Sequence, residues 1–119
     1  MFPGVDIIEI SRFDEACSRH PGLLARLFTP RELESCKDRD IRSLAVRFAG
    51  KEAILKAFGT GLKGLSWQDI EILNDKTGEP IVFLSEKAQI IAESRGGRVI
   101  RISLSHSRDN AVAFAILTP

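Results

Sequence analysis

The chain has 119 residues, enough for one compact domain with a single core and too few for two. Hydrophobic residues make up 44% of it and charged residues 28%, as is usual for soluble globular proteins. The formal net charge of +1 excludes a bulk electrostatic attraction to nucleic acid or to an anionic membrane. We therefore expect a single domain over residues 1–119 whose function depends on local groups of residues.

The first half of the chain predicts one strand followed by several helices. Residues 4–10 are rich in β-branched side chains, which indicates a strand. Ser11 is placed to cap a helix over roughly 12–20, which a Pro-Gly pair then closes. After a short apolar segment, Thr29 and Glu32 frame a capping box with a proline at its first helical position, which predicts the start of a third helical piece.

The longest periodic stretch runs from Ile41 to Phe58 and ends at Gly59, as expected for a helix with a glycine C-cap. One further helix is expected after Ser85, closed by a Gly-Gly pair. Further strands are expected at 66–73, 80–84, 98–105 and 111–117. The turn sequences NDKTG and SRDN suit antiparallel hairpins. This order of elements indicates an α+β fold, a mostly antiparallel sheet packed on one long helix with shorter helices.

Two carboxylates fall where the patterns call for apolar side chains. On a helical wheel of 41–58, Glu52 lies within the apolar stripe and Lys56 on its edge. Alone, this pattern favours an ordinary ion pair one turn apart that reaches outward to solvent. The alternation of the first strand, however, places Asp6 on the same face as Ile8. Two inward-facing acids without Cys or His partners suit a hard cation such as Mg²⁺, and the alternative is two unrelated buried acids.

Other candidate residues carry weaker signals. The turn Gly59-Thr60-Gly61 can bring backbone N–H groups close to a phosphate, although a helix C-cap explains it equally well. Lys51, Lys56 and Lys63 supply positive charge around this turn, where charged side chains are usually solvated. His106 ends a predicted strand, a position more often structural than catalytic. No nucleophilic triad is recognisable, because there is no GxSxG motif and neither cysteine has an evident histidine partner.

Arg12, Arg19 and Arg26 recur every seven residues, so they form a stripe if the helical segments that carry them are collinear. Such a stripe is either a docking surface for an acidic protein or an ordinary solvated face, and the pattern alone favours the solvated face. The two cysteines lack the spacing of a metal site, which predicts free thiols in a reducing cytoplasm. The N-terminus has no signal-peptide character, and no apolar run reaches the roughly 18 residues of a membrane span.

Six blocks of the sequence, taken together, resemble a known family. They are GVDIIEISRF at 4–13, FTPREL at 28–33, RFAGKEAILKAFGTG at 47–61, WQDIEI at 67–72, ISLSH at 102–106 and AVAFAIL at 111–117. In this order, and over nearly the whole chain, they resemble the holo-[acyl-carrier-protein] synthases, the short bacterial phosphopantetheinyl transferases. The pairing of GVDI with KEAxxKAxGTG is the specific part of the resemblance.

The resemblance implies transfer of 4′-phosphopantetheine from coenzyme A to a serine hydroxyl of an acyl carrier protein, with release of adenosine 3′,5′-bisphosphate. It assigns Mg²⁺, with Mn²⁺ as a possible substitute, to Asp6 and Glu52. Lys56 would approach the phosphates, and the nucleotide would lie along residues 59–61 and His106. The family assembles as homotrimers with active sites between subunits. Its first-helix arginines dock the acidic carrier, a role that maps here to Arg12, Arg19 and Arg26.

This sequence departs from the family pattern at two positions. Leu55 stands where many relatives carry a small polar residue, which predicts the loss of one hydrogen bond to substrate. Gly50 replaces the usual alanine, at a cost in helix stability of up to ~1 kcal/mol. The residue that deprotonates the carrier serine is not evident, and Glu52, directly or through a metal-bound water, is the first candidate. A non-catalytic adaptor for acidic carriers and a metal-dependent phosphohydrolase are the alternative functions.

Overall fold

The computed structural model describes all residues, 1–119. Along the chain it contains β1 (Phe2–Glu9), α1 (Ile10–Arg19), α2 (Leu23–Leu27), α3 (Pro30–Cys36), α4 (Ile41–Phe58), the 3-10 helix η1 (Trp67–Asp69), β2 (Ile70–Asn74), β3 (Pro80–Leu84), α5 (Glu86–Arg95), β4 (Val99–His106) and β5 (Asn110–Thr118). None of the helices combines the length and the apolar character needed to cross a bilayer.

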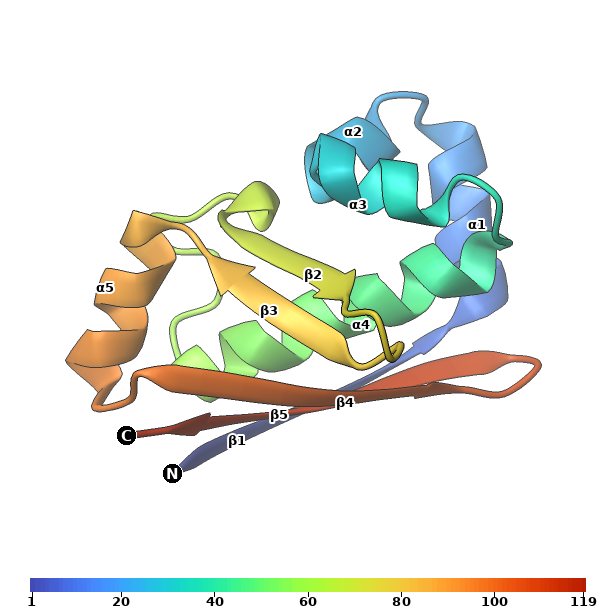
Figure 1. Cartoon of the computed structure of the whole chain (residues 1–119). Helices are drawn as coiled ribbons and strands as arrows, with labels where there is room; N and C mark the ends of the chain where they lie inside the picture. The colour runs from blue at the N-terminus through green and yellow to red at the C-terminus, as the bar shows by residue number, and fades with distance from the viewer.

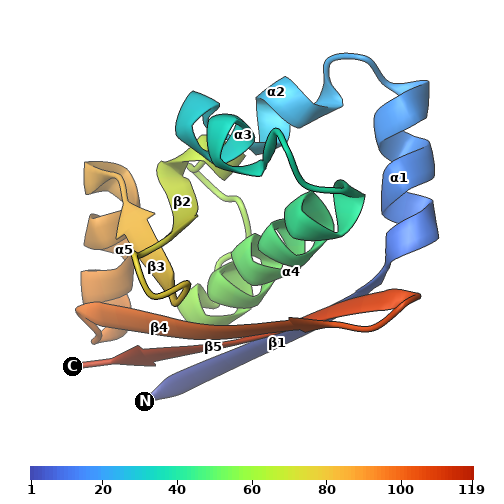
Figure 2. The ribbon, with the colours of Figure 1, turned by 45° about the vertical axis from the view of Figure 1, so that its right-hand side comes forward.

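Helix α4 runs through the middle of the molecule and organises the other elements (Figures 1 and 2). A three-stranded antiparallel sheet in the order β1-β5-β4 packs along one side of it, and the hairpin β2-β3 lies over another side. Helices α1 to α3 gather at its N-terminal end, whereas α5 lies near the opposite end (Figure 1). The α+β prediction is confirmed, with the difference that the strands form two separate sheets.

Small residues let β1 approach α4 closely. A side-chain Cβ built on Gly4 would lie 2.0 Å from the carbonyl oxygen of Ala53, a distance that excludes every other residue. On the facing strand, Ala113 pairs with Asp6 and is fully buried. Because β1 lies directly against the helix, Asp6, two residues beyond Gly4 on the same strand face, also faces α4.

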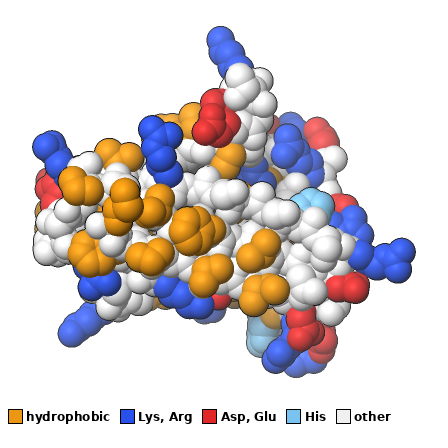
Figure 3. All heavy atoms as spheres, turned by 90° about the horizontal axis from the view of Figure 1, so that it is seen from below, with side chains coloured by type: hydrophobic (Ala, Val, Ile, Leu, Met, Phe, Trp, Pro, Cys, Tyr) orange, Lys and Arg blue, Asp and Glu red, His pale blue; other side chains and the backbone are white.

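The outer face of the three-stranded sheet is apolar (Figure 3). Strand alternation directs the alanines of β5 and Leu117 inward, and Val112 and Phe114 outward. Val112 is 37% and Phe114 45% exposed, and on the neighbouring strand Val5 is 55% and Ile7 65% exposed. An apolar patch of this extent on a sheet face is typical of an interaction surface.

Several element boundaries follow the sequence prediction closely. Helix α4 spans the predicted residues and ends at Gly59, whose φ of 78° is in the left-handed region. The capping box of Thr29 and Glu32 is present with both hydrogen bonds, and Ser85 caps α5. These ends are encoded locally, by hydrogen bonds between residues three apart and by a glycine that tolerates positive φ.

Two boundaries were predicted wrongly. Helix α1 begins at Ile10 and follows Glu9 directly, so Ser11 is not its N-cap. Ile10 packs with Phe13 in a buried apolar cluster, and this helical spacing outweighs the β-branched character of Ile10. The strand predicted at 66–73 begins only at Ile70, because η1 occupies the preceding three residues.

The prediction for the buried side of α4 was also wrong. From Ala45 onward the helix is buried on nearly every side, and its only residues that are not fully buried are Phe48, Glu52 and Lys56. These three lie four residues apart, so they form one row along the open side of the helix. Glu52 therefore faces an opening and does not enter the core. A helix enclosed by a sheet, a hairpin and other helices has no single apolar stripe, so the wheel could not identify its exposed side.

Candidate active site

Three charged side chains from β1 and α4 meet at the open side of the helix. The ammonium of Lys56 donates to Asp6 Oδ1 at 3.0 Å and to the carbonyl oxygen of Val5 at 2.9 Å. The other carboxylate oxygen, Asp6 Oδ2, is buried and has no hydrogen-bond partner. A buried carboxylate oxygen without a partner is costly, so this position is suited to accept a further cation or donor.

Glu52 adds a second negative charge to this position. Partial burial raises the pKa of the Glu52 carboxyl, the neighbouring Asp6 charge raises it further, and Lys56 lowers it in part. The single positive charge of Lys56 thus faces two carboxylates, and a divalent cation would neutralise the remaining negative charge. No cluster of three or more His, Cys, Asp or Glu side chains that could hold a metal occurs in the chain. The two carboxylates of Asp6 and Glu52 suit a hard cation that takes its other ligands from water and substrate, as Mg²⁺ does.

A cavity of about 540 Å³ opens beside these residues. It is lined by Glu52, Leu55, Lys56, Gly59, Gly61, Leu62 and Trp67. The φ angles of Gly59 and Gly61 are 78° and 62°, so the turn after α4 bends through a left-handed conformation that favours glycine. Thr60, between them, is exposed and bonds only locally, to the carbonyl oxygen of Gly61. Backbone and charged side chains thus converge on one open space.

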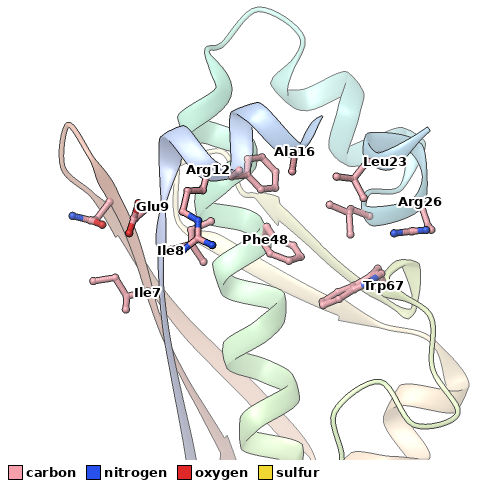
Figure 4. A pocket seen from close by; sticks show the side chains of 12 residues that line it. Ile7, Ile8, Glu9, Arg12, Ala16, Leu23, Arg26, Phe48 and Trp67 are labelled. Atoms are coloured by element: carbon pink, nitrogen blue, oxygen red, sulfur yellow. The ribbon is translucent and has the colours of Figure 1, made fainter. Parts of the chain in front are cut away.

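A second cavity of about 600 Å³ lies at the junction of β1, α1, α2 and η1, and its lining is mostly hydrophobic (Figure 4). Arg12 and Arg26 are both among the residues that line it. Arg19 instead pairs with Glu15 on the exposed surface of α1. Arg12 and Arg19 both lie on α1, and the break between α1 and α2 separates them from Arg26. The three arginines therefore do not form one continuous helical stripe, and two of them, Arg12 and Arg26, line an apolar cavity.

His106 lies outside both of these cavities. It ends β4, two strands away from β1, and its side chain is exposed. Within one chain, the structure brings together Asp6, Glu52 and Lys56 with the glycines of the turn, and it leaves His106 apart.

The prediction of a solvated Lys51 is wrong. Lys51 and Glu32 are both 0% exposed, and their side chains form an ion pair of 2.7 Å. Burial lowers the pKa of the Lys51 ammonium, and the Glu32 charge and hydrogen bond offset part of that effect. Sequence reasoning assigned Glu32 only to a capping box; the pairing across 19 positions has no local signal.

Gly50 and Leu55 also acquire a structural explanation. A Cβ at Gly50 would lie 2.8 Å from Ile72 Cδ1 and 3.1 Å from Leu104 Cδ2, so glycine allows β2 and β4 to pack closely against α4. Leu55 is 4% exposed and lines the cavity beside Glu52. It offers that cavity an apolar wall in place of a hydrogen bond.

Comparisons with known proteins agree with this arrangement. A family model described as the 4′-phosphopantetheinyl transferase superfamily matches residues 3–115. The holo-[acyl-carrier-protein] synthase of Moorella thermoacetica is 49% identical over 116 residues, which cover 96% of this chain and 91% of the relative. That of Geotalea daltonii is also 49% identical, over 96% of this chain and 94% of the relative.

Solved structures agree as well. The holo-[acyl-carrier-protein] synthase of Neisseria meningitidis matches with a TM-score of 0.89 and 31% identity, over 99% of this chain and 98% of that chain. The synthase of Helicobacter pylori in complex with coenzyme A matches with a TM-score of 0.86 and 31% identity, over 98% of this chain and 99% of that chain. The chain is therefore an enzyme of the holo-[acyl-carrier-protein] synthase family, within the 4′-phosphopantetheinyl transferase superfamily.

Proposed function

We propose that the chain transfers the 4′-phosphopantetheine group of coenzyme A to a serine hydroxyl of an apo-acyl carrier protein. The observation that carries this proposal is the grouping of Asp6, Glu52 and Lys56 beside a cavity edged by two left-handed glycines. A relative of the same fold binds coenzyme A. A pyrophosphate needs positive charge and close backbone approach, and both are available here.

In this proposal Asp6 and Glu52 hold Mg²⁺, with Mn²⁺ as a possible substitute. The unpartnered Asp6 Oδ2 supports this assignment, because it is a buried carboxylate oxygen that the chain itself leaves without a partner. A divalent cation bound there would neutralise charge on the pyrophosphate. Lys56, whose side chain is 55% exposed, contributes a further positive charge.

The reaction that we propose is a displacement at phosphorus. The serine oxygen of the carrier bonds to the β-phosphorus, and the bond from that phosphorus to the bridging oxygen breaks. The electron pair leaves with adenosine 3′,5′-bisphosphate, and the serine proton passes to the Glu52 carboxylate. The residues of the chain act mainly by positioning and by charge neutralisation.

The acidic carrier protein is proposed to dock over the mostly apolar cavity between α1, α2 and η1. Arg12 and Arg26 line this cavity, and they would meet acidic side chains while the cavity accepts an apolar one. Arg19, already paired with Glu15, is expected to contribute less.

We further propose that three copies of the chain associate through the apolar outer face of the β1-β5-β4 sheet. Exposed side chains such as Ile7 and Phe114 support this, because water-facing apolar patches favour association. With active sites between copies, His106 would approach a nucleotide bound by the neighbouring copy. Ile7→Glu should convert trimers to monomers in light scattering, whereas Ile90→Glu, on exposed α5, should not. A monomeric parent chain would contradict the proposal.

We also propose that the reaction takes place in the cytoplasm. Cys17 and Cys36 are both free thiols, and unpaired cysteines are typical of proteins from reducing compartments.

The decisive test is to incubate the chain with coenzyme A, Mg²⁺ and an apo-carrier protein, and to weigh the carrier by mass spectrometry. We expect a phosphopantetheine adduct that is lost in Glu52→Gln and reduced in Lys56→Met. Lys63→Met is the matched control, because Lys63 is exposed and lies outside the cavity. Binding without an adduct would favour the adaptor function, and phosphate release without any carrier would favour a hydrolase.

A further inference from the structure

The buried ion pair of Lys51 and Glu32 holds several backbone segments together. The Lys51 ammonium donates to Glu32 Oε1 at 2.7 Å, to the Leu27 carbonyl at 2.7 Å and to the Trp67 carbonyl at 3.1 Å. Glu32 accepts from the backbone N–H of Thr29 at 2.9 Å and from that of Ile72 at 2.8 Å. The pair thus links α2, α3, α4, η1 and β2 at one point.

The hydrogen bond from Lys51 to the Trp67 carbonyl ends at a residue that lines both cavities. Trp67 lines the cavity beside Glu52 and also the arginine-edged cavity. Its ring lies 5.1 Å from that of Phe48, which in turn stacks on Phe13 of α1 at 5.5 Å (Figure 4 shows Phe48 and Trp67). Phe48 is one turn from Glu52 in the open row of α4. Trp67 therefore forms the partition between the two halves of the proposed site.

Trp67 needs external support to keep this position. It belongs to η1, a turn of three residues, which is too short to hold itself in place by its own hydrogen bonds. Lys51 fastens the Trp67 carbonyl to α4, and Gln68 Nε2 fastens the next residue to carbonyl oxygens of Ala25 and Phe28, at 2.6 and 3.1 Å. A buried ion pair is by itself a weak source of stability. The position of the Lys51–Glu32 pair is therefore better explained by the backbone segments that it holds in place.

We propose that Lys51 and Glu32 are positioning residues that hold Trp67 as the shared wall of the two cavities, and that they thereby set the affinity for both the nucleotide donor and the carrier protein. This inference rests on the proposed transfer reaction for its kinetic readout. The structural part of the inference, that a buried ion pair holds Trp67 in place, does not depend on that reaction.

The test uses the double variant Glu32→Gln/Lys51→Met in the full chain. Methionine matches lysine in length, glutamine can still accept from Ile72, and removing both charges avoids leaving one buried alone. Trp67 is the only tryptophan, so its fluorescence reports directly on the wall. We expect a red-shifted emission, stronger acrylamide quenching, and KM values for coenzyme A and carrier that rise about tenfold with a smaller change in kcat.

Leu117→Ala is the control for a general loss of stability. Leu117 is fully buried beside Gly97, and it is not a lining residue of either cavity. This variant should lower the thermal midpoint but leave both KM values and the Trp67 emission unchanged. A double variant that behaves in the same way, unstable but with unaltered KM and emission, would overturn the proposal.

A double-mutant cycle separates action through Trp67 from a direct effect. If the ion pair acts through this wall, adding Glu32→Gln/Lys51→Met to Trp67→Ala should not raise the KM values further. Additive effects would overturn that route. If the parent chain formed no adduct at all, the proposed function would fail, whereas the fluorescence comparison would still decide whether the ion pair positions Trp67.

Discussion

Helix α4 carries two lysine–carboxylate pairs whose lysines are only five residues apart. Lys51 and Glu32 are both 0% exposed, and each makes several further hydrogen bonds. Lys56, in contrast, is 55% exposed, and its partner Asp6 keeps a buried oxygen without any hydrogen bond. Lys51 and Glu32, here called the closed pair, have partners for their polar atoms, whereas Lys56 and Asp6, here called the open pair, leave one carboxylate oxygen without a hydrogen bond.

The difference between the two pairs separates charged residues that stabilise the fold from charged residues that can bind a ligand. In the closed pair, the Lys51 ammonium donates all of its hydrogen bonds to acceptors of the protein, so the pair has no free donor for a ligand. In the open pair, Glu52 adds a second carboxylate that the one lysine does not balance. Unbalanced charge at an opening is expected to accept a ligand, and the balanced pair is expected to govern stability and geometry.

The largest effect is expected from breaking the closed pair at one partner. Glu32→Ala leaves the Lys51 ammonium buried without its carboxylate, which should cost about 3–5 kcal/mol of unfolding free energy. Asp6→Asn, in the open pair, should change stability by less than about 1 kcal/mol. Urea denaturation at pH 7 measures both values. Equal losses for the two variants would remove the distinction between the pairs.

The next effect is on activity and concerns the open pair. Glu52→Gln should reduce adduct formation at least about 100-fold, because a charge used in the transition state is lost. Its stability should be unchanged or slightly higher, since the substitution removes a partly buried charge and its repulsion with Asp6, which together outweigh the lost attraction to Lys56. Mass spectrometry of the carrier and a thermal melt provide the two measurements. Full activity in this variant would contradict the metal assignment.

A third prediction concerns the turn that borders the open pair. Gly59→Ala forces a left-handed alanine and brings its Cβ to 2.8 Å from the Arg95 guanidinium, so it should cost about 1–2 kcal/mol and weaken coenzyme A binding. Gly22→Ala is the matched control, because nothing lies within 4 Å and its φ is −88°. Urea denaturation and calorimetric titration with coenzyme A distinguish the two. A neutral Gly59→Ala would show that the turn can rearrange.

The smallest effect is the pH dependence of the metal-free chain. Because folding raises the pKa of Glu52 above 4.5, the folded chain holds this proton more tightly than the unfolded chain. Unfolding free energy should therefore fall as the pH rises from 4.5 through the raised pKa. The fall should be small, because Glu52 is partly exposed and solvent screens its charge. Glu52→Gln should lack it, and an identical pH profile would contradict the predicted shift.

Local sequence determined several of the helix ends of this protein and which charged residues belong to the candidate site. Gly59 and the Thr29–Glu32 capping box are decided by backbone geometry and by hydrogen bonds between near neighbours. The family motifs alone were enough to single out Asp6, Glu52 and Lys56 as one group. Alternation along β1 correctly predicted that Asp6 faces inward.

Tertiary structure alone decided which charges are buried and which are open. A helical wheel could not identify the exposed side of α4, because the three-stranded sheet, the β2-β3 hairpin and other helices cover different sides of it. The pairing of Lys51 with Glu32, the meeting of Arg12 and Arg26 at one cavity, and the place of Trp67 between two cavities all depend on contacts between distant segments. Such contacts are set by packing and not by local pattern, so the open and closed lysine pairs of α4 become distinguishable only in the folded chain.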